Sequence, residues 1–181
     1  MSPNLILQAI YLMLPAYMAN MAPVFFRSVN FLNYPLDFNK TYRGKPLLGS
    51  HKTFRGLFFG ALFGVSTAYF QHLLAIHKIA VFLQPPGLGY SDWFWLGFLL
   101  GSGALVGDAV KSFFKRRIGI MPGERFLPWD QIDFVLGALM FVRFIYAVPF
   151  SICVIAIASS FLLHVATNHI GFYLGIREEK W

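Results

Sequence analysis

Long apolar segments constrain the fold of this chain more than any other feature of its sequence. A helix that crosses the hydrocarbon core of a bilayer needs about 20 mostly apolar residues. The stretch 131–171 is about twice that length and holds only two charged residues, Asp133 and Arg143. Because Pro149 disfavours helix at the residue before it, we divide the stretch at that proline. The sequence then predicts five spans, at residues 4–26, 56–83, 92–114, 131–148 and 149–171.

The composition also favours a lipid environment. The chain is 57% hydrophobic and 13% charged, whereas soluble domains average about 25% charged residues. We therefore predict an all-α, integral membrane helical bundle with five transmembrane helices, a single domain over residues 1–181, located in the cell membrane. The net charge of +7 suggests an anionic partner, but we expect no nucleic acid because a large water-facing surface is missing. Cys153 lies in an apolar run and is expected to be a small buried hydrophobe.

The distribution of Lys and Arg predicts the orientation in the membrane. The loop 27–55 holds six of them and the segment 111–125 holds five, whereas the loop 84–91 holds none. Five spans place the two basic segments and the basic tail on one side, and the positive-inside rule makes that side cytoplasmic. We therefore expect an external N-terminus, a cytoplasmic C-terminus, and cytoplasmic loops at 27–55 and 115–130.

Charged and polar residues gather at the end of the third span. Asp108, Lys111, Ser112 and Lys115 are spaced i, i+3, i+4 and i+7, which places them on one helical face. Asp108 lies about two turns inside the basic exit, where a carboxylate is costly unless it faces water, the bundle interior or a cation. An ion pair with Lys111 or Lys115 would also satisfy it.

Two further carboxylates open the fourth span. Asp130 as the N-cap and Asp133 in the first turn would both favour the helix dipole, but this does not exclude a second role. Together with Asp108 they place three carboxylates on one cytoplasmic hairpin, beside several bases. Such oxygen ligands suit Mg²⁺ held together with phosphates, and Lys and Arg suit the phosphates themselves.

A second polar cluster, "GSHKTFRG" at 49–56, precedes the second span. Ser50 or Thr53 can cap the helix, and free N–H groups with Lys52 and Arg55 at a helix start form an anion site. An ordinary basic flank of a membrane helix is the alternative. His51 alone lacks the spacing of a zinc site. Because both polar clusters are on the predicted cytoplasmic side, we expect Lys52 to lie near Asp108.

A polar residue also lies within the first span. Asn20, with Pro23, is expected to interrupt this helix, and polar residues at membrane depth mark functional interiors or hydrogen bonds between helices. The small residues of the second span, such as Gly60 and Gly64, would allow close helix approach. We expect the first two spans to form one wall of an apolar groove that opens sideways to the membrane.

These motifs resemble the signature of the integral-membrane CTP:phosphatidate cytidylyltransferases. The family's Gly-Asp, Ser, Lys-Arg, Pro-Gly and Asp-x-x-Asp elements are matched by Gly107, Asp108, Ser112, Lys115, Arg116, Pro122, Gly123, Asp130 and Asp133. The family's Ser-x-x-Lys-Thr-x-x-Gly element is matched by Ser50, Lys52, Thr53 and Gly56, with one residue fewer between the serine and the lysine.

Two departures point to one branch of that family. The family's His-Gly-Gly is replaced by Glu124-Arg-Phe-Leu-Pro128, and its Asp-Arg-x-x-Asp pattern reads Asp-Gln-Ile-Asp. With the short five-span length and the tail "HVATNHIGFYLGIREEKW", the chain is similar to the archaeal branch, the CDP-archaeol synthases.

The resemblance implies a reaction and a set of site residues. CTP would give its CMP moiety to a lipid phosphate in the bilayer, 2,3-di-O-geranylgeranylglyceryl phosphate, with release of diphosphate. Asp108, Asp130, Asp133 and Lys115 would be catalytic, and the three aspartates would hold Mg²⁺ as the cofactor. The sequence leaves a homo-oligomer open. The residues expected to bind substrate are Ser50, His51, Lys52, Thr53, Arg55, Lys111, Ser112, Arg116, Gly119, Pro122, Gly123 and Asn20.

A non-enzymatic transporter or channel with a buried charged site is the alternative function. Against it, the sequence shows no internal repeat, and its charges gather at one face of the membrane rather than at the midplane. Diphosphate release that depends on CTP and Mg²⁺ would distinguish the two functions.

Overall fold

The computed structural model describes residues 3–121 and 124–173, and this part of the chain is helical. Its five α-helices are α1 (Pro3–Phe25), α2 (Phe54–Ile76), α3 (Trp93–Arg117), α4 (Trp129–Val142) and α5 (Phe150–Tyr173). Two short 3₁₀ turns, η1 (Val81–Leu83) and η2 (Tyr90–Asp92), precede α3. The loop between α1 and α2 contains one antiparallel hairpin of two-residue strands, β1 (Thr41–Tyr42) and β2 (Lys45–Pro46). The prediction of a helical bundle is confirmed at this level.

Four of the described helices are long and apolar enough to cross a membrane: α1, α2, α3 with the preceding η2, and α5. The fifth, α4, has 14 residues and is therefore about 21 Å long, shorter than the roughly 30 Å hydrocarbon core. The helix predicted at 131–148 thus ends early, at Val142. The segment after it turns back on itself and is fastened where the Tyr146 hydroxyl donates to the carbonyl of Pro86, at 2.8 Å.

Other predicted boundaries shift by smaller amounts. The span predicted at 56–83 ends as a helix at Ile76, and the chain then turns through Ala80, which has a left-handed φ of 57°. The predicted interruption of the first span is wrong, because α1 continues through Pro23 to Phe25. Neighbouring helices allow a membrane helix to tolerate proline, and a Cβ built on Gly56 of α2 would lie 3.3 Å from the Pro23 ring.

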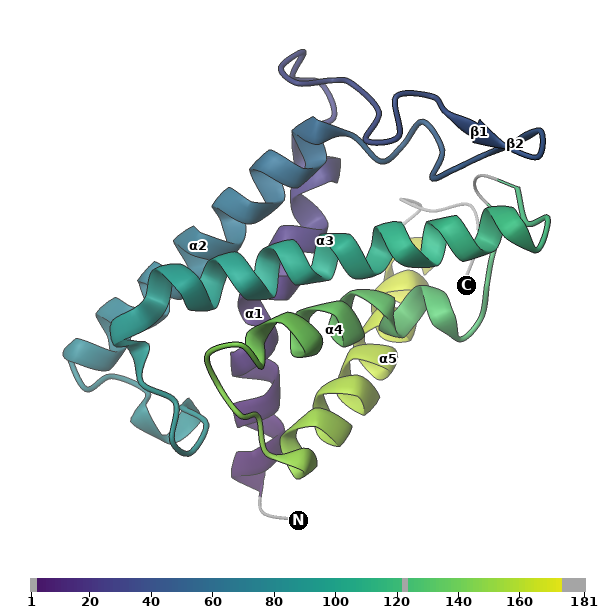
Figure 1. The fold of residues 1–181 in the computed structure, drawn as a ribbon. Helices are drawn as coiled ribbons and strands as arrows, with labels where there is room; N and C mark the ends of the chain where they lie inside the picture. The colour runs from purple at the N-terminus through teal and green to yellow at the C-terminus, as the bar shows by residue number, and fades with distance from the viewer. Residues whose placement is uncertain (1–2, 122–123, 174–181) are drawn as a thin grey trace.

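The helix α3 packs closely against α2 on one part of its length and against α4 on another. A Cβ built on Gly64 of α2 would lie 2.6 Å from the carbonyl oxygen of Gly97 on α3. A Cβ built on Gly107 of α3 would lie 2.4 Å from the carbonyl oxygen of Asp133 on α4. Neither position has room for a side chain, so glycine permits both close approaches, as expected for small residues in membrane helices. Figure 1 shows α4 running alongside α3, with the β1–β2 hairpin beside the C-terminal end of α3.

The buried core lies where α1 meets the other helices. Leu12 and Met13 of α1, Leu100 of α3, Val135 of α4 and Ile152 of α5 are fully or almost fully buried. Large apolar side chains are also exposed over the outside of the helices, as a lipid-facing surface requires. Examples are Phe70, Phe94, Met140, Phe150 and Leu162.

Candidate active site

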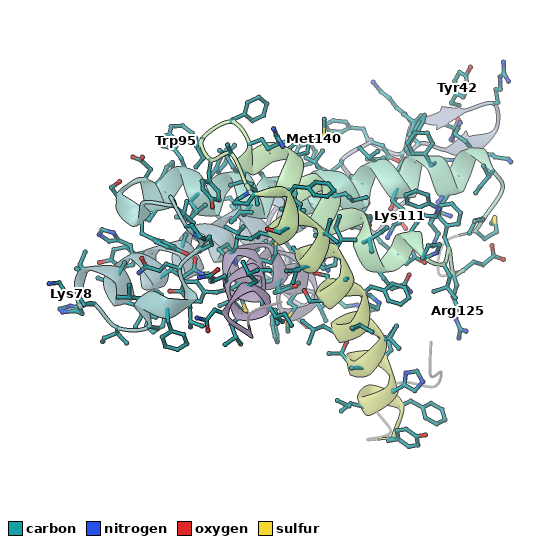
Figure 2. All side chains as sticks on the ribbon, turned by 90° about the horizontal axis from the view of Figure 1, so that it is seen from below. Tyr42, Lys78, Trp95, Lys111, Arg125 and Met140 are labelled. Carbon is teal, nitrogen blue, oxygen red and sulfur yellow. The ribbon has the colours of Figure 1, made fainter. Side chains whose placement is uncertain are left out.

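The three aspartates predicted to act together converge on one lysine. The ammonium of Lys111 lies 3.0 Å from Oδ1 of Asp108, 3.0 Å from Oδ1 of Asp130 and 2.8 Å from Oδ2 of Asp133. Its side chain is 14% exposed. Figure 2 shows Lys111 between α3 and α4, toward the end of the molecule where Tyr42 and Arg125 lie, with Lys78 at the other end. We call Asp108, Lys111, Asp130 and Asp133 the carboxylate cluster.

Two more lysines pair with the cluster from outside. The ammonium of Lys52 contacts Oδ2 of Asp108, and that of Lys115 lies 3.2 Å from both carboxylate oxygens of Asp130. The expected contact between Lys52 and Asp108 is therefore confirmed. Three carboxylates face three ammonium groups, so the formal charges of the cluster and its two flanking lysines cancel.

The local sequence explains why these side chains meet. Asp108 and Lys111 are one turn apart on α3, and Asp130 and Asp133 are one turn apart on α4. Because Gly107 lets the backbone of α4 approach at Asp133, the two acidic faces come within reach of the same ammonium. Asp130 lies inside the first turn of α4, where its Oδ2 accepts from the N–H of Phe126 at 2.6 Å. The expectation that Asp130 is the N-cap is wrong, since Pro128 holds that position.

Asp130 is outside the candidate spans, and its environment fixes its charge. Burial by itself would raise the pKa of this carboxyl. The hydrogen bond and charge of Lys111, the N–H of Phe126 and the charge of Lys115 lower the pKa below its ordinary value. Asp130 is therefore ionised at neutral pH.

The loop 27–55 is folded around one buried aspartate. Asp37 accepts from the backbone N–H groups of Asn39, Leu48 and Gly49, at 3.0, 2.8 and 3.2 Å. Burial would raise the pKa of Asp37, but these three N–H donors lower it. The loop then reaches Thr53, whose side chain accepts from the N–H of Gly56 and caps α2. This path carries Lys52 to the carboxylate cluster.

Arg117 fastens the hairpin of that loop to the end of α3. Its guanidinium donates to the carbonyls of Tyr42 at 2.9 Å, Lys45 at 3.3 Å and Pro46 at 2.5 Å. It also lies over the ring of Tyr42, 5.3 Å from the centroid. The loop is thereby held against the helix that provides Asp108 and Lys111.

Three cavities adjoin the cluster and differ in lining. A cavity of about 140 Å³ is basic, with Lys52, Lys111, Lys115 and Arg116 in its wall. A second, of about 260 Å³, lies between α1 and α2 and has polar groups from Asn20, His51 and Thr53 together with Asp108. The largest, of about 510 Å³, is an almost wholly apolar groove between α3 and α4.

The predicted substrate-binding residues divide into three groups. Those that line at least one of these cavities are Asn20, His51, Lys52, Thr53, Lys111, Ser112 and Arg116. In the described part of the chain, Ser50, Arg55 and Gly119 lie outside these linings, and Arg55 instead donates to the carbonyl of Val29 at 2.6 Å. Pro122 and Gly123 lie outside the described residues.

The chemistry of the three carboxylates suits Mg²⁺, which prefers oxygen ligands. Since each lies within 3.0 Å of one nitrogen, their oxygens are already gathered around a cation. Within residues 3–121 and 124–173, no set of three His, Cys, Asp or Glu side chains is arranged as a metal site. The ammonium of Lys111 separates the carboxylates that would have to close on a metal ion.

Asp37 and Arg117 organise the site, yet the sequence analysis missed them. The only local signal for Asp37 is the Asp-x-Asn pattern, typical of a turn in which the aspartate accepts from the backbone two residues on. Arg117 is one of the five basic residues of the segment 111–125. Its role could not be predicted, because its acceptors are more than 70 residues away in the sequence.

Fold and site together define a multi-pass membrane protein with a charged, phosphate-suited site at one end of its helices. Comparison with known proteins then identifies the family: the family described as "CarS-like: CDP-archaeol synthase" matches residues 3–181. The chain belongs to this family. It is an enzyme of the nucleotidyltransferase type, as the resemblance implied.

Individual relatives agree along almost the whole length. CDP-archaeol synthase from Archaeoglobus fulgidus is 38% identical, covering 98% of this chain and 99% of its own length. The enzymes from Methanococcoides burtonii and Methanocaldococcus jannaschii are 37% and 35% identical, covering 93% and 98% of this chain and 100% and 98% of their own lengths. A solved structure of an intramembrane enzyme for archaeal membrane lipids biosynthesis superimposes with a TM-score of 0.73 at 34% identity, covering 90% of this chain and 94% of the other.

Proposed function

We propose that this enzyme transfers the CMP moiety of CTP to the phosphate of a membrane lipid, 2,3-di-O-geranylgeranylglyceryl phosphate, giving CDP-archaeol and diphosphate. Family membership supports the product. The observation that carries the proposal is the position of the carboxylate cluster. It lies between a basic cavity that suits phosphates and an apolar groove that suits lipid chains.

The Lys and Arg side chains of the site reduce the main electrostatic barrier of this reaction, which is the repulsion between its two substrates. Both substrates are anions, and catalysis of phosphoryl-type transfer consists mostly of positioning and charge stabilisation. Lys52 and Lys111 would screen the repulsion between the triphosphate and the attacking lipid phosphate. Lys115 and Arg116, which line the same basic cavity, would neutralise the departing diphosphate. No general base is required, because the attacking lipid phosphate is already ionised.

We assign Asp108, Asp130 and Asp133 as the residues that would hold Mg²⁺. When bound, such an ion polarises phosphoryl oxygens and offsets the negative charge that builds up on them. Asp130 is ionised by its surroundings and contacts Lys111. Asp108 lines the cavity between α1 and α2, and Asp133 lines the apolar groove.

The α3–α4 groove is the proposed path for the lipid. Lys111 and Asp133 stand in its wall together with apolar side chains of both helices, such as Val110, Leu136 and Met140. Met140 is 72% exposed, so the groove opens on the outer surface of the bundle. A lipid phosphate at Lys111 could keep its isoprenoid chains in the bilayer.

The proposed lipid groove lies between α3 and α4, whereas the sequence predicts that the first two spans form one of its walls. The small residues of the second span pack against α3 and leave no free groove there, because a Cβ on Gly64 would already overlap the backbone of α3. The cavity between α1 and α2 is about half the size of the apolar groove and has polar groups in its lining.

We further propose that the end of the helix bundle with the carboxylate cluster faces the cytoplasm, that the chain crosses the membrane five times, and that the N-terminus is external. The excess of Lys and Arg in 27–55 and 111–125 supports this orientation. The fifth crossing would be made by α4 together with the non-helical segment that follows it.

The reaction can be tested with the purified chain in detergent. Diphosphate release should require CTP, a lipid phosphate and a divalent cation together, and it should stop when the lipid phosphate is replaced by the corresponding alcohol. Met140→Trp, which fills the groove, should impair the long-chain lipid far more than a short-chain lipid phosphate. Phe150→Trp, on another exposed helix face, is the matched control. Equal effects of the two substitutions would remove the groove from the proposal.

Orientation needs a separate experiment. In a Cys153→Ala background, a cysteine at Gly87 should react with an impermeant maleimide added outside intact cells, and a cysteine at Lys45 should not. The reverse labelling would place the carboxylates away from cytosolic CTP and would overturn the cytoplasmic assignment.

A further inference from the structure

Lys111 holds the position in the carboxylate cluster that a metal ion would need. Its nitrogen contacts one oxygen from each of the three aspartates, at 2.8 to 3.0 Å. Magnesium–oxygen bonds are about 2.1 Å long, so the carboxylates would have to move inward by almost 1 Å, and the ammonium would have to leave, before all three could bind one ion. Lysine and metal therefore compete for the same oxygens.

The charge balance favours the lysine when no substrate is bound. Lys52 and Lys115 pair with Asp108 and Asp130 from outside. With Lys111 as the third ammonium, the three carboxylates are already neutralised. A divalent cation added to this arrangement would leave two positive charges in excess within a largely buried cluster. Mg²⁺ also gives up its water reluctantly, which makes binding of the free ion costly.

A bound nucleoside triphosphate changes both the charge balance of the cluster and the cost of binding the metal ion. It brings the missing negative charge, and it offers phosphate oxygens both to the metal and to the displaced ammonium. Lys111 is suitably placed for that exchange, because it lines the basic cavity as well as the apolar groove.

We propose that Lys111 is a tethered counter-cation, which keeps the three carboxylates together in the nucleotide-free enzyme, excludes free divalent cations from them, and yields its place only to a metal–nucleotide complex. This rests on the proposed function for the identity of the nucleotide, but the exclusion of free metal is a property of the empty enzyme. A lysine that only bound phosphate would act differently: its removal would affect nucleotide affinity and leave metal binding in the absence of nucleotide unchanged.

The test measures Mn²⁺ binding to the full chain in detergent, by loss of the electron paramagnetic resonance signal of the free ion. Without nucleotide, the wild type should bind Mn²⁺ weakly, and Lys111→Met should bind it about tenfold more tightly or better, because one charge in contact with three carboxylates is removed. Adding CTP to the wild type should increase the bound Mn²⁺ above the amount that CTP binds alone.

Lys115→Met is the matched control. It removes the same charge from the same helix, but Lys115 contacts one of the three carboxylates, Asp130. Its Mn²⁺ affinity should rise by no more than about threefold. Adding Asp133→Asn to Lys111→Met should abolish the gain.

Three results would overturn the proposal: tight Mn²⁺ binding by nucleotide-free wild type, an unchanged affinity in folded Lys111→Met, or an equal gain in Lys115→Met. Circular dichroism reports whether each variant is folded. Lys111→Gln removes the charge but keeps a donor, and it replaces Lys111→Met if the carboxylates prevent folding once the Lys111 ammonium is gone. Failure of the proposed function would appear instead as absent diphosphate release by the wild type, which leaves the nucleotide-free comparison valid.

Discussion

Gly107→Ala tests whether the close approach of α3 and α4 assembles the site. The new Cβ would lie 2.4 Å from the carbonyl oxygen of Asp133, whereas ordinary contacts begin at 3.4 Å. The helices must therefore separate locally by about 1 Å. Since Asp133 lies 2.8 Å from the Lys111 ammonium, this contact and the position of the carboxylate are lost together.

The magnitudes for stability and activity should differ. Overpacking costs about 1–3 kcal/mol, while alanine is favoured over glycine in a helix by up to about 1 kcal/mol. The net loss in the free energy of unfolding should be about 0–2 kcal/mol. A displacement of about 1 Å in a catalytic group can cost roughly 100-fold in rate, so turnover should fall far more than stability.

Thermal unfolding in detergent and diphosphate release measure the two effects. Gly64→Ala is the matched control, because its Cβ would overlap the backbone of α3 at 2.6 Å on the α2–α3 contact, away from the carboxylates. It should lose similar stability and much less activity. In Gly89→Ala the nearest atom would be 3.6 Å from the Cβ, and nothing should change. Wild-type turnover in Gly107→Ala, or equal losses of turnover in Gly107→Ala and Gly64→Ala, would refute the reasoning.

Three further predictions address single side chains. Asp108→Asn should lower turnover by about 100-fold or more while the protein stays folded by circular dichroism; activity near that of the wild type would remove Asp108 from the metal site. Lys52→Ala should raise the KM for CTP about tenfold and affect stability much less, because Asp108 keeps the ammonium of Lys111 at 3.0 Å; steady-state kinetics and thermal melting separate the two. Asp37→Ala should cost about 1.5–3 kcal/mol at pH 7 through three lost N–H acceptor contacts. Because the folded pKa of Asp37 is lowered, its contribution is present above the unfolded pKa of about 4 and disappears as the pH falls through the folded pKa. The difference in melting temperature between wild type and Asp37→Ala should therefore shrink in acid, and a constant difference would contradict this assignment.

The sequence predicted the helices and the carboxylate cluster because both depend on local patterns. Apolar length located four of the long helices, and the i, i+3 spacing of Asp108 with Lys111 and of Asp130 with Asp133 placed each pair on one helix face. The cluster followed once both pairs were assigned to the same end of the bundle.

The end of α4 could not be predicted in the same way. Apart from Arg143, apolar residues continue after Val142 without a helix-breaking residue before Pro149, so the pattern favours a longer helix. The helix instead ends at Val142, and the contact from Tyr146 to Pro86 that holds the following segment spans 60 residues of sequence. The fold of the loop 27–55 was missed for the same reason. It depends on N–H donors to Asp37 that lie 11 and 12 residues further along the chain, and on Arg117.

The contact of Arg117 with the hairpin has a consequence for sequence variation. The guanidinium binds the main-chain carbonyls of Tyr42, Lys45 and Pro46, and every amino acid supplies a carbonyl. Tyr42 also contacts the guanidinium through its ring, and Gly44 has a left-handed φ of 74° that favours glycine. Lys45 and Pro46 can therefore be exchanged without losing this attachment. The arginine cannot, because lysine lacks the planar, forked donors that reach several carbonyls at once. Substitutions should accordingly be tolerated at Lys45 and rejected at Arg117, although both are basic residues at the same surface.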